Sequence, residues 1–220
     1  MKKMRLQRVI RAAMVSTVLV CTPLWAANAT TALDQVSELQ KDWAHIKYEV
    51  PEKQREKAFE QLAERARGYA EESKDSAEVL IWDAIVLSTY AGEKGGLGAL
   101  SLVKEARNKL ENALALDPGA LQGSAYTSLG SLYYQVPGWP IGFGNDDKAE
   151  EMLKKALSLN PNGIDPNFFY GDYLLKQGRK AEAKAAFEKA LSAPPRVGRE
   201  LADRGRHEEI SEKLGQLKSQ

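Results

Sequence analysis

Residues 126–161 read YTSLGSLYYQVPGWPIGFGNDDKAEEMLKKALSLNP, and this stretch decides how the rest of the chain is interpreted. At both of its ends, apolar residues recur every three or four positions, which is the period of an amphipathic helix. Its middle, residues 136–147, is rich in proline and glycine, which is typical of a loop. The stretch therefore predicts two helices joined by a long connection.

The second of these helices carries a pattern of alanine, a large apolar residue, alanine and proline that occurs three times at one spacing. The copies are Ala106-Leu110-Ala113-Pro118, Ala149-Leu153-Ala156-Pro161 and Ala183-Phe187-Ala190-Pro195. Two small residues seven apart on one face let a neighbouring helix approach closely, and the large residue between them fills the remaining space. Proline then ends the helix. Three copies predict a chain built from repeated helical hairpins.

A helical period continues outside these copies, and no segment of any length alternates with the period of a strand. We expect an all-α fold, an α-solenoid of about four helical hairpins with a C-terminal capping helix. Further helices are expected over residues 33–48, 52–73, 77–90, 101–116, 166–177 and 180–193, with a flexible connection over residues 92–98. The four hairpins span residues 33–73, 77–118, 124–161 with the insertion 136–147, and 164–195, and the cap spans 200–218.

The first helices of the hairpins share a second pattern, which allows a family resemblance to be stated. It is clearest in Tyr126-x2-Leu129-Gly130-x2-Tyr133 and looser in Asn167-x2-Tyr170-Gly171-x2-Leu174 and Leu80-x2-Asp83-Ala84-x2-Leu87. With 34 residues between Ala149 and Ala183, the chain resembles tetratricopeptide-repeat proteins over nearly all of its mature length. The resemblance implies a non-enzymatic scaffold that binds a protein or peptide partner in a concave groove.

Two segments carry a narrower resemblance. VPGWPIGFGNDD at residues 136–147 and NGIDPNFFYGDYLL at residues 162–175 are similar to segments of exported bacterial proteins of this type. A subset of those proteins is grouped with the T-component of TRAP transporters, periplasmic helical-repeat proteins thought to work beside a substrate-binding protein. The alternative function is therefore an accessory of a solute uptake system that binds or passes a small molecule.

Residues 1–29 are typical of a signal peptide. A basic start precedes the uncharged, mostly apolar residues 12–25, and Ala27-Asn28-Ala29 offers the small residues of a cleavage site. We therefore expect cleavage after Ala29, a periplasmic location and no membrane insertion once the signal is removed. An uncleaved membrane anchor is one alternative. Lipidation at Cys21 is another, but the bulky Val20 before it argues against a lipoprotein signal.

The composition of the mature chain, residues 30–220, excludes several function classes. Removing the five basic residues of the leader leaves 26 basic and 30 acidic residues, a formal charge of −4, which argues against nucleic acid as a partner. The mature chain contains no cysteine, and its two histidines, His45 and His207, lie far apart and outside any zinc motif. We expect no catalytic site, cofactor or metal, and the composition is compatible with a homo-oligomer.

Candidate partner-binding residues come from two sources. In the insertion, Trp139 and Phe143 present large apolar surfaces. They can face a partner, or they can fold back on the repeat core, and for Trp139 the sequence slightly favours the core. The family resemblance implies further groove residues on the first helices, each of which an ordinary solvated position explains equally well: Thr127, Ser131, Tyr134, Phe168, Asp172 and Lys176.

Two polar groups have mainly structural interpretations. Asp147 with Glu150 is most simply a helix N-cap pair. Four arginines near the last helix, Arg196, Arg199, Arg204 and Arg206, can contact an anionic ligand, or they can pair with Asp203, Glu208 and Glu209 nearby. Pairing within the chain is the more common outcome.

Overall fold

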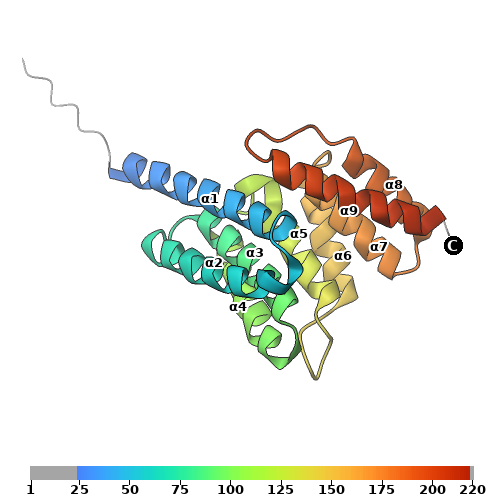
Figure 1. Ribbon diagram of the computed structural model, residues 1–220, viewed down its shortest axis with the longest axis horizontal. Helices are drawn as coiled ribbons and strands as arrows, with labels where there is room; N and C mark the ends of the chain where they lie inside the picture. Colours follow the sequence, from blue (N-terminus) through green and yellow to red (C-terminus); the bar gives the residue numbers. More distant parts are fainter. Residues whose placement is uncertain (1–23, 219–220) are drawn as a thin grey trace, which may run out of the picture.

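The computed structural model describes residues 24–218, and in this part of the chain all regular structure is helical (Figure 1). The predicted leader, apart from its last six residues, lies outside the described residues. The helices are α1 (Leu24–Tyr48), α2 (Glu52–Glu72), α3 (Ala77–Lys94), α4 (Gly96–Leu116), α5 (Ala120–Gln135), α6 (Asp146–Leu159), α7 (Ile164–Lys176), α8 (Lys180–Leu191) and α9 (Glu200–Lys218). None of these helices is long and apolar enough to cross a bilayer. The predicted all-α helical-repeat fold is confirmed.

The helices pair as consecutive hairpins that stack into a solenoid. The closest partners are α3 with α4, α5 with α6, and α7 with α8, and each hairpin packs on the next through α2–α3, α4–α5 and α6–α7. The first helices α1, α3, α5 and α7 also contact one another in series. They therefore form one continuous wall, which lies on the inner side of the curved stack.

The repeated alanine pattern sets the spacing within each hairpin. In each copy the two alanines and the large residue between them, for example Ala149, Leu153 and Ala156, are completely buried. The partner helix meets the large residue with a glycine, because a β-carbon on Gly130 would lie 2.6 Å from Cγ of Leu153. Gly171 meets the ring of Phe187 in the same way. The small residue of the first helix and the large residue of the second are thus one packing unit.

A buried ion pair joins the helices of the second hairpin. Asp83 on α3 is fully buried, and the ammonium group of Lys109 on α4 lies 2.7 Å from its carboxylate. Lys109 also lies 3.6 Å from Glu105, which accepts hydrogen bonds from Arg67 on α2. Burial raises the pKa of Asp83, although Lys109 opposes this effect. The pair therefore ties three helices together at one point.

Two local predictions were wrong. Residues 92–98 were expected to be a flexible connection, but α3 continues to Lys94 and α4 begins at Gly96. Gly95 and Gly96 adopt left-handed backbone angles, φ of 63° and 61°, which reverse the chain within a single turn and leave the flanking residues free to be helical. Asp147 is not the N-cap of α6, because Asn145 accepts the capping hydrogen bond from the backbone N–H of Lys148.

The chain forms a left-handed turn at the start of the third hairpin. Leu121, Gln122 and Gly123 have φ values of 47°, 56° and 77°, so the regular part of α5 begins after them. A β-carbon on Gly123 would lie 2.7 Å from Leu159 on the adjacent helix, which explains why glycine stands there. Leu121 and Gln122 adopt a conformation that costs roughly 1–2 kcal/mol per residue. Both face the inner side of the solenoid.

The solenoid is closed on itself. The capping helix α9 packs on α8 and α7 as expected, and it also contacts α1, at the other end of the sequence (Figure 1). At this junction, a β-carbon on Gly205 of α9 would lie 2.4 Å from the ring of Tyr48 of α1. The inner wall is therefore not an open groove but the lining of a space bounded by both ends of the described chain.

Candidate functional site: a cavity on the inner face

A cavity of about 1580 Å³ occupies the inner side of the closed solenoid. Its walls come from α1, α3, the start of α4, α5, α7, the segment after α8, and α9. It is larger than the roughly 300–1,000 Å³ that ordinary small-molecule sites occupy. The space is therefore large enough for a segment of a polymer.

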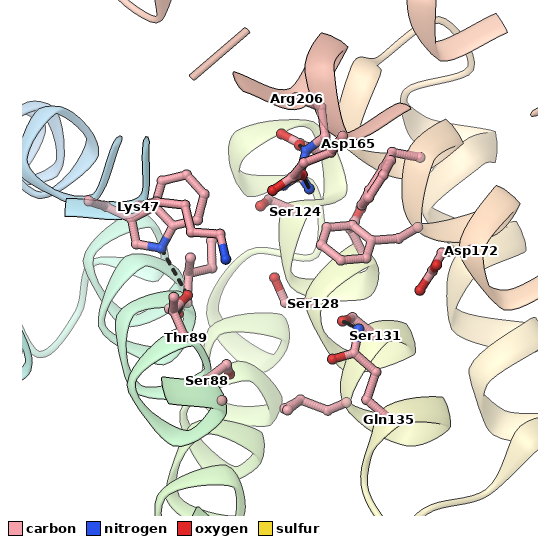
Figure 2. A pocket seen from close by; sticks show the side chains of 18 of the residues that line it. Lys47, Ser88, Thr89, Ser124, Ser128, Ser131, Gln135, Asp165, Asp172 and Arg206 are labelled. Atoms are coloured by element: carbon pink, nitrogen blue, oxygen red, sulfur yellow. Dashed lines mark hydrogen bonds and ion pairs between the residues drawn. The ribbon is translucent and has the colours of Figure 1, made fainter. Parts of the chain in front are cut away.

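One wall is a row of hydroxyl groups on α5 (Figure 2). Ser124, Ser128, Ser131 and Gln135 follow one another at helical spacing and face the cavity, with Thr127 beside them. The side chains of Ser124, Thr127 and Ser128 have no hydrogen-bond partner among the described residues, whereas Ser131 accepts from the amide of Gln135 at 3.0 Å. Such a row can donate to and accept from the backbone of a bound chain.

The opposite wall is aromatic and hydroxylic. The indole N–H of Trp43 on α1 donates to Thr89 on α3 at 2.8 Å, and Trp43 also meets the ring of Trp82 edge-on, with centroids 6.3 Å apart. Lys47 reaches from this side toward the space in front of α5, and its nearest carboxylate, that of Glu93, lies 3.9 Å away (Figure 2). The cavity therefore offers a polar wall on α5 to the polar groups of a ligand and an aromatic wall opposite to its apolar groups.

The end of the cavity beside α9 is charged. Asp165, at the start of α7, accepts a hydrogen bond from Arg196 at 2.6 Å and another from Arg206 at 3.1 Å (Figure 2). Arg196 also holds Asp203, and Arg206 also pairs with Glu209. Burial alone would raise the pKa of Asp165, but the two guanidinium groups outweigh it and hold that pKa well below its usual range.

The same end contains aromatic partners for these cations. The guanidinium of Arg206 lies 4.2 Å from the ring centroid of Phe168 and 5.1 Å from that of Phe169. Tyr48 from α1 lines this end as well, and its hydroxyl is buried with no hydrogen-bond partner in the described part of the chain. Burial raises the pKa of Tyr48, with Arg206 opposing the shift, so its hydroxyl stays protonated.

The structure places four of the predicted groove residues in the cavity: Thr127, Ser131, Phe168 and Asp172. Asp172 is not a free contact, because it accepts from the Tyr134 hydroxyl at 2.8 Å and pairs with Lys213 of α9 at 2.6 Å. Tyr134 is buried beneath the wall, and burial raises its pKa well above the usual value. Lys176 donates to the backbone carbonyl of Tyr134 near the end of α5. Tyr134 and Lys176 therefore support the wall and do not line the cavity.

The two aromatic residues of the insertion have opposite environments. Phe143 folds back: its ring meets that of Tyr133 edge-on, with centroids 5.8 Å apart, and Arg107 stacks over it at 4.6 Å. Trp139 is 90% exposed at the tip of the loop, so the interpretation that it fills the repeat core is wrong. The backbone of the loop closes on itself, because the N–H of Gly144 donates to the carbonyl of Pro137 and leaves no room for a β-carbon at position 144.

The sequence interpretation missed most of the cavity wall. Ser124, Ser128 and Gln135 were not singled out, although their spacing of four, three and four residues around Ser131 is a visible signal. Trp43 and Trp82 were not singled out either, and Arg206 was expected either to contact an anionic ligand or to pair with acidic residues nearby. These side chains approach α5 and α7 because α1 meets α9 and closes the solenoid, and no local sequence pattern indicates that contact.

The described residues contain no group of three or more histidine, cysteine, aspartate or glutamate side chains arranged to hold a metal. Most carboxylates and guanidinium groups at the charged end form ion pairs with one another, mainly through Asp165. The arrangement is thus suited to recognition by hydrogen bonds, charge and apolar contact.

Comparison with known proteins supports the repeat assignment for the third and fourth hairpins. A family model described as a tetratricopeptide repeat matches residues 141–162 and 164–196. A solved structure of TTC0263, a thermophilic TPR protein of Thermus thermophilus, is similar, with a TM-score of 0.39 and 20% sequence identity, covering 70% of this chain and 91% of that chain. No curated protein matches this chain.

Proposed function

We propose that this chain is an exported, non-enzymatic helical-repeat scaffold that holds an extended segment of a partner protein in its inner cavity. The observation that carries the proposal is the wall of α5, where Ser124, Thr127 and Ser128 present hydroxyl groups that have no partner among the described residues. An extended peptide carries unpaired backbone donors and acceptors that match such a row. The aromatic wall opposite offers apolar contact to its side chains.

Export is supported by the leader pattern and is compatible with the fold. The buried residues that the structure describes in α1 begin at Ala32, so cleavage after Ala29 removes none of them. The mature chain would keep Val36, Leu39 and Trp43, which anchor α1 on its neighbours. A periplasmic partner follows as part of the proposal.

Site-specific photocrosslinking in cells tests this function. A photoreactive amino acid at position 128 should form an adduct with a defined protein, whereas the same residue at Ser158, on the exposed side of α6, should not. Ser128→Trp should obstruct the cavity beside the hydroxyl row and reduce crosslinking from position 131, while Ser158→Trp should leave it intact. Equal labelling from positions 128 and 158 would refute the proposal.

The closed form of the solenoid favours a second candidate. Because α1 meets α9, the cavity is bounded on more sides than an open groove, as a site for a small solute requires. The chain would then act like the T-component accessory of a TRAP-type uptake system. Genes for a membrane permease and a solute-binding protein beside this one, together with no macromolecular adduct from position 128, would favour this candidate over the scaffold.

A further inference from the structure

Arg199, the residue directly before α9, differs from the other arginines of the charged end. Arg196 and Arg206 each bind two carboxylates, whereas Arg199 has no carboxylate partner among the described residues. Its Nε is buried without an acceptor, and its guanidinium lies over the ring of Trp82, 5.0 Å from the centroid. Arg199 lines the cavity.

The surroundings make this lack of a partner costly. Burial, and after it the repulsion from Arg196, lower the pKa of Arg199. The nearby carboxylates of Asp165 and Asp203 oppose this shift, but neither forms an ion pair with Arg199. A half-buried cation without a hydrogen-bonded anion loses hydration that such an anion would restore. The face of the Trp82 ring compensates only part of this lost hydration, because an aromatic ring attracts a cation less strongly than a carboxylate attracts it. Arg199 thus retains binding capacity that the chain itself does not use.

We propose that Arg199 is an anion-binding subsite, which takes a carboxylate of the ligand held in the cavity. This inference rests on the proposed function, since it specifies the chemistry of what the cavity holds. A single negative charge fits better than a phosphate dianion, because Arg196 and Arg206 carry two positive charges against the three carboxylates of Asp165, Asp203 and Glu209, so this cluster offers a ligand only the guanidinium of Arg199.

The neighbours of Arg199 also define what the carboxylate is attached to. Trp82, Phe168 and Phe169 face this part of the cavity, so the group that carries the charge is apolar. The hydroxyl row of α5 lies farther along the same space (Figure 2). Two sources supply this chemistry: an acidic side chain within an otherwise apolar peptide segment, or a free organic acid with an apolar body.

Calorimetric titration of the full chain with matched probes tests the subsite. One pair is 4-phenylbutyrate and its uncharged amide. The other pair is the end-blocked pentapeptide Ala-Leu-Glu-Leu-Ala and its glutamine analogue. We expect at least one acid to bind about tenfold or more tightly than its neutral counterpart, as is usual for a charged hydrogen bond. A preference shown by the peptide pair indicates a protein segment, and one confined to phenylbutyrate indicates a free acid.

Three variants assign the preference to Arg199. Arg199→Gln should abolish the difference between acid and neutral probe, and Arg199→Lys should keep part of it. Arg204→Gln, which removes an exposed arginine five residues away, should leave the difference unchanged. The thermal unfolding of each variant shows whether it is folded.

The subsite and the proposed function fail in different ways. Equal binding of acid and neutral probe, no detectable binding of either acid at millimolar concentration, or a preference that survives in Arg199→Gln would each overturn the subsite. Crosslinking from position 128 without any acid preference would leave the scaffold function standing. Acid preference at Arg199 without a protein adduct would keep the subsite and refute the scaffold.

Discussion

The ring of Tyr48 packs so closely on the backbone of Gly205 that a β-carbon at position 205 would lie 2.4 Å from Cδ1 and Cε1 of the ring. This contact joins α1 to α9 and therefore closes the cavity at its charged end. The first described helix and the last one depend on each other through a residue that has no side chain.

Gly205→Ala should loosen this junction. The added methyl group forces Tyr48 to move, and overpacking of this kind costs roughly 1–3 kcal/mol. Hydrogen exchange of the amides in the last two turns of α1 should become faster, while exchange in α3 and α4 stays unchanged. Denaturant unfolding should show the loss of stability.

The matched control is Gly215→Ala on the same helix. A β-carbon there meets nothing within 4 Å, so the substitution should stabilise α9 by about 0.5–1 kcal/mol. If both substitutions had the same effect, Tyr48 would not be held by Gly205.

Asp165→Asn should destabilise the charged end. It leaves Arg196 and Arg206 with less negative charge in a half-buried site, and we expect a loss on the order of 2–3 kcal/mol, reduced from a fully buried case because the carboxylate meets the cavity. Denaturant unfolding at neutral pH measures it. Asp75→Asn, at an exposed turn residue, is the control and should change stability by less than about 0.5 kcal/mol.

The same carboxylate predicts an acid dependence. The folded-state pKa of Asp165 lies below the unfolded value of about 3.9, so its contribution is present above that pH and is lost as the pH falls toward the folded pKa. The wild-type chain should therefore lose stability below about pH 4 more steeply than Asp165→Asn. Parallel acid profiles for the two proteins would show that the ion pairs of Asp165 contribute nothing.

The insertion loop offers a paired test of exposure. Trp139→Ser should leave the free energy of unfolding within about 0.5 kcal/mol, because the side chain is 90% exposed. Phe143→Ala should cost about 1–3 kcal/mol, since it removes the contacts with Tyr133 and Arg107. A large loss of stability in Trp139→Ser would contradict the exposed position of this side chain. Chemical denaturation followed by far-UV circular dichroism measures both.

Because Asp83 and Lys109 form a buried ion pair, we expect substitutions of the two residues to have strongly non-additive effects on the free energy of unfolding. Lys109→Met should cost roughly 3–5 kcal/mol at neutral pH, because it leaves a buried carboxylate without its cation. The folded-state pKa of Asp83 is raised and should rise further, so the deficit should shrink as the pH falls and the carboxyl takes up a proton.

A double-mutant cycle checks this interpretation. Adding Asp83→Leu to Lys109→Met should recover most of the loss, because an apolar pair of similar volume needs no counter-ion. Additive losses from the two substitutions would mean that the groups do not interact.

The repeat core was predictable because its determinants are local. Ala149, Leu153 and Ala156 lie within two turns of helix, and their spacing alone states which face is buried. The same holds for Gly130, whose place opposite Leu153 follows from the first-helix pattern. For α8 the predicted range 180–193 lies close to the observed Lys180–Leu191, whereas α4 begins at Gly96, five residues before the predicted start.

The cavity was predictable only in part. Thr127, Ser131, Phe168 and Asp172 were placed in it by the family resemblance, but its opposite wall depends on contacts between distant segments. Trp82 and Arg199 are more than a hundred residues apart, and the local sequence around neither residue indicates that the two make contact. The exposure of Trp139 also had no local signal, since an aromatic residue between prolines suits a core as well as a surface.

The contact between α1 and α9 changes how this solenoid unfolds. In an open stack each repeat touches only its neighbours, so the outer repeats fray first and unfolding spreads inward. Here the outer helices hold each other, and α1 cannot leave without exposing α9. Closing so long a stretch of chain costs entropy that grows only with the logarithm of its length, so a few well-packed contacts offset it. Proteases should therefore not cleave α1 or α9 before the other helices, and the described helices should unfold together.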